Sequence, residues 1–119
     1  MKKIIIILFT SLLFFSCSDS QEVKMVKNGI LNSYPNKTLG QLVEGFVGDP
    51  KWESIKDDKG DKYVNITGII KYYERDTKII LQYKINGNTF ELNAIEFNDV
   101  PQNFFVYEAL IEKMYMESN

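Results

Sequence analysis

The sequence predicts one two-layer α+β domain, in which an antiparallel, three- to four-stranded meander sheet is packed by two helices. A chain of 119 residues fits a single domain. Residues 62–97 form successive runs of β-branched and aromatic residues separated by turn residues. Segments 38–47 and 99–115 instead carry apolar residues at helical spacing behind a capping residue. With the helices on one face of the sheet, we expect the other face to stay partly open.

The N-terminal segment combines two lysines with an apolar run and the sole cysteine of the chain. Lys2 and Lys3 precede Ile4–Phe15, which is shorter than the ~20 apolar residues that cross a bilayer. The run has the length of a signal-peptide core, and Ser16 is the small residue that precedes a cleavage site. Together with Cys17, this arrangement resembles the lipobox of bacterial lipoproteins, although leucine usually stands at the position of Phe14.

The lipobox resemblance implies that Cys17 is a lipid attachment point. The thiol would carry fatty acyl chains such as palmitate, and the chain would be cut in front of it. Two or three chains anchor firmly, because each buried methylene adds about 0.8 kcal/mol. An ordinary signal peptide cut elsewhere, or an uncleaved anchor, is the alternative. Ser18 differs from the aspartate that retains lipoproteins in the inner membrane, so we expect the cell outer membrane, on its periplasmic or its surface face.

The chain therefore divides into three parts. We expect a signal peptide at 1–16, the lipidated cysteine with a flexible tether at 17–27, and the α+β domain at 28–119. Removal of Lys2 and Lys3 leaves 12 basic residues against 16 acidic ones. Within this scheme, Val23–Pro35 is expected to form a first strand or an extended lead-in, with a turn at Asn28–Gly29.

The segment 38–47 is the clearest helix. Thr38 and Gln41 have the spacing of a capping box, and Gly48 and Pro50 are expected to end the helix. The apolar residues fall on one helical face, as expected of a helix that packs on a core: Leu39, Leu42, Val43, Phe46 and Val47.

Four strands are expected after this helix. They cover residues 52–55, 62–73, 78–85 and 89–97, with turns at 56–62 and 74–77. Asn86–Gly87 favours a type I′ hairpin turn, because both residues tolerate positive φ angles. The alternation of apolar residues changes near Ala94, which predicts a bulge or a strand end there.

The segment 99–115 is the second expected helix. Asp99 and Gln102 have the spacing of a capping pair, and Pro101 is tolerated in a first turn. An apolar stripe follows at Tyr107, Leu110, Ile111 and Met114. Phe104 and Phe105 are adjacent and so lie ~100° apart around the helix, which places one of them at the rim of the core.

The composition argues against several classes of function. The sequence contains no histidine, the commonest general base and transition-metal ligand, and Cys17 is expected to be acylated. A net charge of -2 does not fit a nucleic-acid-binding protein. The stretch DDKGD lacks the third oxygen ligand of a calcium loop, because Lys59 stands there. We therefore expect no enzyme, no metal and no cofactor.

Exposed aromatic residues are the one sign of a binding site. The candidates for partner binding are Trp52, Tyr72, Tyr73, Phe104 and Phe105. Tyrosine and tryptophan are favoured at protein interfaces, since they bury much area and keep a polar group. Tyr72 and Tyr73 would point to opposite faces of a strand, so one should lie outside the core. The competing interpretation is a core with scattered surface aromatics.

The stretch NKTLGQLVEGFVGDPKWES, followed by hairpins, is similar in layout to known small domains. It resembles the small lipoprotein of the outer-membrane β-barrel assembly machine and β-lactamase-inhibitor-like domains. The similarity covers residues 38–97, and the C-terminal helix departs from it. It implies a non-catalytic module that binds another envelope protein through a sheet face or its loops, with no functional residue carried over. The alternative is a small hydrolase that uses paired carboxylates on an envelope glycan or peptide.

Overall fold

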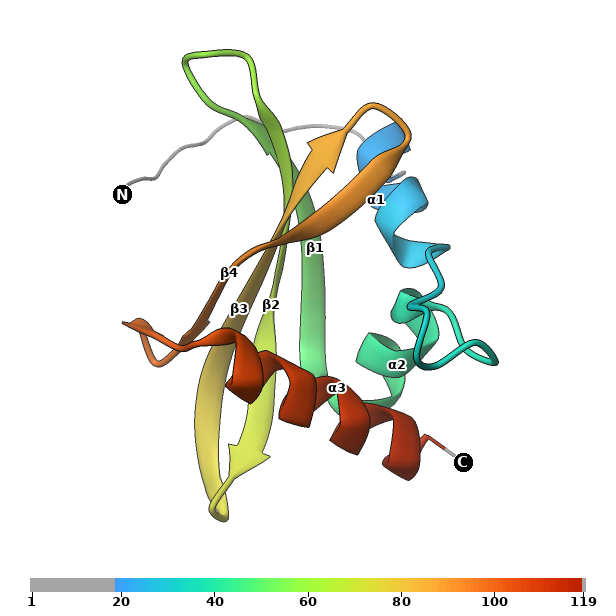
Figure 1. Cartoon of the computed structure of the whole chain (residues 1–119). Helices are drawn as coiled ribbons and strands as arrows, with labels where there is room; N and C mark the ends of the chain where they lie inside the picture. The colour runs from blue at the N-terminus through green and yellow to red at the C-terminus, as the bar shows by residue number, and fades with distance from the viewer. Residues whose placement is uncertain (1–18, 119) are drawn as a thin grey trace.

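The computed structural model describes residues 19–118, so the expected signal peptide and Cys17 lie outside the described residues. Two helices lead into a five-stranded sheet, and a third helix follows it (Figure 1). The elements are α1 (Gln21–Lys27), α2 (Leu39–Phe46), β1 (Gly48–Lys56), β2 (Lys62–Tyr72), β3 (Arg75–Asn86), β4 (Thr89–Phe97), β5 (Val100–Pro101) and α3 (Phe104–Glu117). The strands lie in the order β1-β2-β3-β4-β5, and every neighbouring pair is antiparallel. The predicted α+β meander is confirmed, with a short fifth strand and a third helix added.

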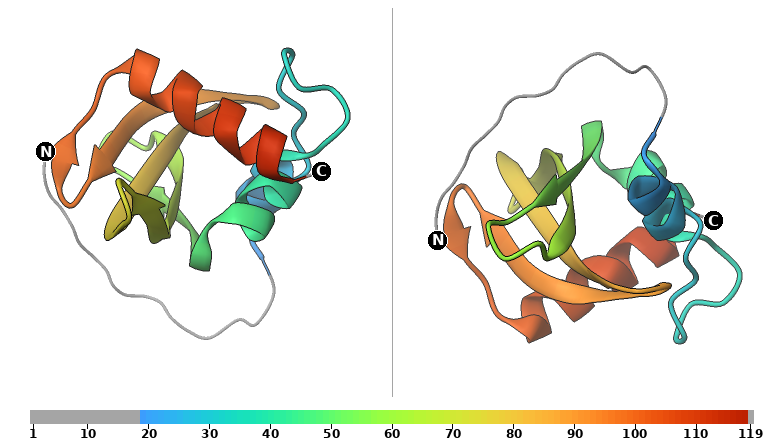
Figure 2. Two further views of the ribbon diagram at one scale, coloured as in Figure 1. Left: turned by 90° about the horizontal axis from the view of Figure 1, so that it is seen from below. Right: turned by 90° about the horizontal axis from the view of Figure 1, so that it is seen from above.

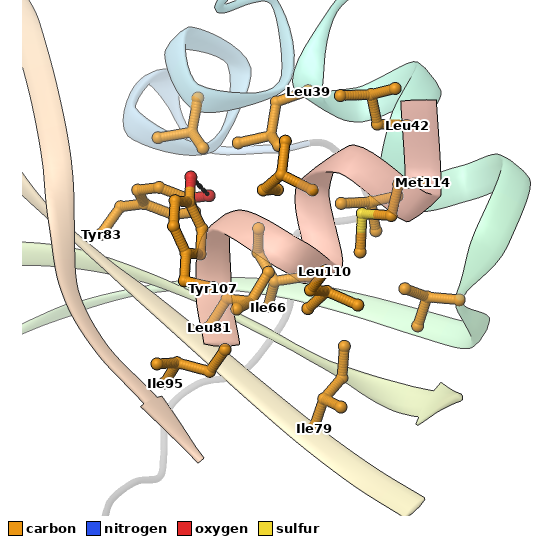
Figure 3. Close-up of a cluster of buried hydrophobic side chains, with 14 of the residues drawn as sticks. Leu39, Leu42, Ile66, Ile79, Leu81, Tyr83, Ile95, Tyr107, Leu110 and Met114 are labelled. Atoms are coloured by element: carbon orange, nitrogen blue, oxygen red, sulfur yellow. Dashed lines mark hydrogen bonds between the residues drawn. The ribbon is translucent and has the colours of Figure 1, made fainter. Parts of the chain in front are cut away.

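All three helices contribute to one core on the same face of the sheet. Alternating residues of β2 and β3, such as Ile66 and Leu81, are fully buried there, because successive side chains of a strand point to opposite faces. Leu39 and Met114 reach this core from α2 and α3 (Figure 3). Figure 2 shows α3 along one side of the curved sheet and α1 and α2 along another. The opposite face of the sheet carries half-buried and exposed residues.

The segment before residue 28 differs from the prediction. Gln21–Lys27 is a helix, so the expected strand or extended lead-in is wrong. The segment 17–27, expected to be a flexible tether, therefore includes a helix that packs on the core. The Ser20 hydroxyl accepts a hydrogen bond from the Val23 N–H at 3.1 Å and caps this helix. Val23 and Val26 are buried, and their spacing of three residues places both on the face toward the core.

Helix α2 begins as predicted and leads directly into β1. The Thr38 hydroxyl accepts from the Gln41 N–H at 3.1 Å, and the Thr38 N–H donates to Gln41 Oε1 at 2.8 Å, which completes the capping box. Strand β1 starts at Gly48, four residues before the predicted strand. Its pairing with β2 shifts register between Gly48 and Lys51, so Pro50 and the turn residues beside it do not prevent strand formation.

The hairpin turns fall at positions that differ from those predicted. Between β2 and β3 the turn is Tyr73–Glu74, both with positive φ, whereas residues 75–77 already pair with β2. Between β3 and β4 the hairpin expected at Asn86–Gly87–Asn88 is confirmed, with its turn at Gly87–Asn88. Only Gly87 has positive φ, so the expected type I′ conformation of Asn86–Gly87 is wrong. The bulge expected near Ala94 is confirmed, since the β3–β4 register shifts beside it.

Helix α3 starts later than predicted. Asn103 is its N-cap and accepts a hydrogen bond from the Val106 N–H at 3.0 Å. Asp99, the predicted cap, lies instead in the β4–β5 turn, and Pro101 belongs to β5. The expected apolar stripe is confirmed, because these residues are buried: Tyr107, Leu110, Ile111 and Met114.

Candidate binding surface

The β2–β3 turn presents two tyrosines and one arginine at the end of the sheet. Tyr72 is the last residue of β2 and lies on the core face with Ile70, two residues earlier. Its ring centroid is 5.0 Å from that of Phe97 and 4.6 Å from that of Tyr73. Tyr73 sits in the turn itself and is 83% exposed. We call residues 72–75 the tyrosine turn.

The backbone of the tyrosine turn is unusual for its residue types. Tyr73 and Glu74 have φ angles of 50° and 64°, in the left-handed region that favours glycine. The β4–β5 turn has the same φ pattern, at 50° and 70°, but uses Asn98 and Asp99, which tolerate it better. A bulky aromatic and a glutamate are therefore held in a conformation that other residues would adopt at lower cost.

Arg75 completes the tyrosine turn, and the sequence analysis did not single it out. It is exposed, and no carboxylate among the described residues lies within ion-pair distance of its guanidinium. The neighbouring Asp76 pairs with Lys71 at 2.6 Å. The sequence contains a feature that could have indicated this residue, because Arg75 is the one arginine of a chain whose other basic residues are lysines.

The first turn of α3 exposes a second aromatic group, Phe104 and Phe105, which we call the helix-start pair. Phe105 is 81% exposed, and Phe104 is more than half exposed. The Phe104 ring centroid lies 5.7 Å from that of the buried Tyr107, so Phe104 occupies the rim of the core. Val100, also exposed, pairs with Phe97 in the sheet and precedes the helix by four residues.

The tyrosine turn and the helix-start pair lie on the same side of the molecule. Seen along the vertical axis of Figure 1, the β2–β3 turn, the β4–β5 turn and the start of α3 lie away from α1 and α2 (Figure 2). Tyr72 contacts Phe97, which pairs with Val100, so this side is linked through the sheet. Four of the five predicted aromatic residues thus belong to the tyrosine turn or to the helix-start pair.

Trp52 is the fifth predicted residue, and it lies elsewhere. Its Nε1–H donates to Glu44 Oε2 at 3.0 Å, and the Lys27 ammonium is 5.1 Å from its ring centroid. The ring is half-buried and packs on the core beside α1 and α2. Its contacts join both helices to β1 and do not bring it to the other aromatic candidates.

The open face of the sheet is a third surface, and it is more polar. A row of amides crosses it: Gln82 Nε2 donates to Asn65 Oδ1 at 3.0 Å, and Asn93 Nδ2 donates to Gln82 Oε1 at 2.6 Å. Ile69 is the one exposed large hydrophobic residue of this face among the described residues. The amides largely satisfy one another's hydrogen-bonding groups. This face therefore offers a partner fewer free contacts than the tyrosine turn and the helix-start pair.

Two carboxylates among the described residues have a clearly shifted pKa, and both shifts are downward. A hydrogen bond from its own backbone N–H, aided by Lys62, lowers the pKa of Glu22. Desolvation acts to raise the pKa of Asp57, but hydrogen bonds from Asp61, Tyr63 and Lys59 lower it overall. These shifts keep both carboxylates ionised, the opposite of what a general acid needs.

Two shallow pockets in the described surface are each lined by one carboxylate side chain. The first, of about 220 Å³, lies between α3 and the loop before α2, with Glu108 in its wall. The second, of about 280 Å³, lies beside Glu22 and its ion-pair partner Lys62, 3.3 Å away. No group of acidic residues suited to a metal ion occurs among the described residues. None of the described helices has the length and apolar character needed to cross a bilayer.

Comparisons of the chain with protein-family models, with curated proteins and with solved structures find no match. The resemblance in layout to small envelope lipoproteins therefore stays a prediction.

Proposed function

We propose that this chain is a lipid-anchored, non-enzymatic module of the cell envelope that binds another envelope protein. Cys17 supplies the anchor, and the tyrosine turn together with the helix-start pair supplies the binding surface. The assembly factors and inhibitors to which the sequence is similar in layout are non-catalytic proteins that bind other proteins through a sheet face or its loops. The partner replaces water over aromatic rings that the fold of the monomer leaves exposed.

One observation carries this proposal. Tyr73, in the β2–β3 turn, and Phe105, in the first turn of α3, are 83% and 81% exposed. Large exposed aromatics on a small monomer mark interaction sites, because each ring left in water forgoes about 1.5–3 kcal/mol of burial. Aromatic residues at the centre of interfaces carry a large part of binding energy.

The titratable groups support a binding role over a hydrolytic one. The sequence supplies no histidine to act as a general base. Glutamates considered for carboxylate chemistry, such as Glu74 and Glu91, are exposed, and hydrogen bonds lower the pKa of Glu22 and that of Asp57. A retaining or inverting glycosidase needs one carboxyl group with a raised pKa beside a second carboxylate.

Co-purification from detergent-solubilised membranes tests the binding surface. Tagged, full-length protein is compared with the double variant Tyr73→Ala/Phe105→Ala. We expect the variant to lose a co-purifying envelope protein, by roughly 30-fold or more, which corresponds to the ~2 kcal/mol of a binding hot spot. Met116→Ala is the matched control, because Met116 is an exposed apolar residue in the last turn of α3. Equal capture by both variants would contradict the proposal.

The anchor is tested by intact-mass spectrometry of the protein from membranes. We expect a mature chain that begins at Cys17 and carries acyl groups. The Cys17→Ala variant should appear in the soluble fraction or keep its leader. An unmodified sulfur, or a mature N-terminus elsewhere, would show that the anchor assignment is wrong.

A further inference from the structure

We propose that the tyrosine turn receives a carboxylate side chain of the protein partner. The Arg75 guanidinium would pair with the carboxylate, while Tyr72 and Tyr73 cover the apolar surface around it. This inference rests on the proposed function and specifies which part of the surface determines partner choice. It makes the helix-start pair a flanking contact.

The conformation of the turn is the first support. Each residue in the left-handed region costs roughly 1–2 kcal/mol unless it is glycine, asparagine or aspartate. The same chain builds a turn of the same φ pattern from Asn98 and Asp99. The residues at 73 and 74 are therefore not those that the turn requires, and strain of this kind concentrates at functional sites.

The chemistry of Arg75 is the second support. Among the described residues its guanidinium has no carboxylate partner, while seven lysines of the domain do. Arginine differs from lysine in offering a planar donor pair that binds a carboxylate in two places and stacks on aromatic rings. An arginine beside two tyrosines combines residue types that dominate binding hot spots.

The position of the turn decides between a protein carboxylate and the phosphate groups of the anchoring membrane. Glu22, in the first turn of α1, pairs with Lys62 at the start of β2. Tyr72 ends the same strand, 11 residues long, so the two ends are roughly 33 Å apart at 3.3 Å per residue. Figure 1 shows the start of α1 and the β2–β3 turn at opposite ends of the molecule. The turn therefore faces away from the end that enters the bilayer through Cys17.

Photo-crosslinking in living cells locates the contact. A photoreactive phenylalanine replaces Glu74 in the tyrosine turn, Ala109 beside the helix-start pair, or Lys59 in the β1–β2 turn. We expect capture of one envelope protein from position 74 and none from position 59. Capture from 109 alone would overturn this inference and leave the proposed function standing, whereas capture from none of them would overturn both.

Binding of the crosslinked protein, identified and purified, tests the charge. We expect Arg75→Ala to weaken binding by roughly 30-fold and Arg75→Lys to recover only part of it, since lysine lacks the paired donors. Arg75→Glu should abolish binding, and substitution of the contacted partner carboxylate by lysine should restore it. Unchanged affinity of Arg75→Ala would overturn the inference. Arg75-dependent binding to phosphatidylglycerol vesicles, without a protein partner, would also overturn it in favour of a phosphate ligand.

A redesigned turn separates binding from folding. Tyr73→Asn/Glu74→Gly supplies the residues that a turn with two positive φ angles prefers. We expect this variant to have a higher thermal unfolding midpoint than the natural chain and to lose partner capture. The matched change in the other turn, Asp99→Gly, should leave capture intact. A variant that is more stable and still binds with full affinity would show that Tyr73 and Glu74 have no role in recognition.

Discussion

Two buried tyrosines show how single residues fix this core. The hydroxyls of Tyr83 and Tyr107 are 2.8 Å apart, and one donates to the other between β3 and α3 (Figure 3). Both rings are buried, so neither hydroxyl can exchange its partner for water at no cost. The bond therefore ties the C-terminal helix to the sheet at a defined position.

Replacement of one tyrosine should cost more than replacement of both. Tyr107→Phe leaves the Tyr83 hydroxyl buried without a partner, which we expect to lower the free energy of unfolding by about 1–3 kcal/mol. The double variant Tyr83→Phe/Tyr107→Phe removes the unsatisfied group and should recover part of this loss. Urea unfolding followed by circular dichroism measures both. A double variant that loses the sum of the two single effects would contradict this account.

The same pair should make stability depend on pH in the alkaline range. Burial raises the pKa of Tyr83 well above its usual value, and burial also raises the pKa of Tyr107, although the hydrogen bond between the two hydroxyls opposes this at Tyr107. A raised pKa favours the neutral form in the folded state. The contribution is fully present below the unfolded pKa of about 10 and is lost as pH rises through the folded pKa.

Unfolding midpoints in urea between pH 8 and pH 11 measure this dependence. We expect the natural chain to lose stability steeply above about pH 10. The double phenylalanine variant should lose less, since its lysines and other tyrosines still titrate and only the buried pair is gone. Parallel curves for the two proteins would rule out the pair as the source.

At the scale of elements, the sequence patterns located most of the fold. The capping box at Thr38 and the apolar stripe of α3 are local signals, because both depend on residues three or four apart. The sequence predicts the start of α3 at Asp99, because Asp99 and Gln102 have the spacing of a capping pair and Pro101 is tolerated in a first turn. In the structure Asp99 has φ 70° in a turn and pairs with Lys78 at 2.8 Å, which leaves Asn103 as the cap.

Helix α1 and the tyrosine turn could not be located in this way. Helix α1 has seven residues and two buried valines, which is too short a pattern to distinguish a helix from a flexible tether. A helix of this length depends on packing against the core for its stability. Tyr73 is a poor turn residue by type, so local propensity extends the predicted strand through it and places the turn at 74–77. The pairing of Tyr72 with Arg75 across the hairpin overrides that propensity. The surroundings of the tyrosine turn include contacts between residues distant in sequence, such as Tyr72 with Phe97, which local patterns do not predict.

Two glycines show how the α2–β1 corner packs on the sheet. A Cβ added at Gly68 in β2 would lie 2.9 Å from the Gly48 carbonyl oxygen and 2.3 Å from Val47 Cγ1. Val47 and Gly48 lie so close to Gly68 that a methyl group at position 68 does not fit. Gly45 lies in the exposed face of α2, and a Cβ there meets nothing within 4 Å.

These two positions should respond in opposite directions to the same substitution. We expect Gly68→Ala to lower the free energy of unfolding by about 1–3 kcal/mol, because the corner has to move. Gly45→Ala should raise it by roughly 0.5–1 kcal/mol, since alanine loses less entropy in a helix. Thermal and urea unfolding of the two variants provide the measurement. A neutral Gly68→Ala would mean that β1 is not held against β2 as described.

At the scale of the whole molecule, the position of α1 determines how the anchored domain would face its surroundings. Ser20 caps α1, and Asp19, two residues after Cys17, pairs with Lys27 at 2.8 Å, so both residues are held against α1. Three residue steps separate Cys17 from Ser20, a reach of at most about 11 Å. The domain measures 36 × 28 × 26 Å, longer than this reach in every direction. An acylated Cys17 would therefore hold the α1 end near the bilayer and direct the tyrosine turn away from it.

Energy transfer to a membrane dye tests this orientation. Because the proposed acylation would consume the sole cysteine, Lys59→Cys and Glu74→Cys would each give the lipidated protein one free thiol for a fluorophore. We expect strong transfer from position 59, in the turn next to the Glu22–Lys62 pair, and weak transfer from position 74. Insertion of 12 Gly/Ser residues after Asp19 adds a flexible reach of roughly 20 Å and should reduce the difference. Equal transfer from both positions with the natural tether would mean that the anchor does not orient the domain, and that the tyrosine turn can meet partners within the membrane plane.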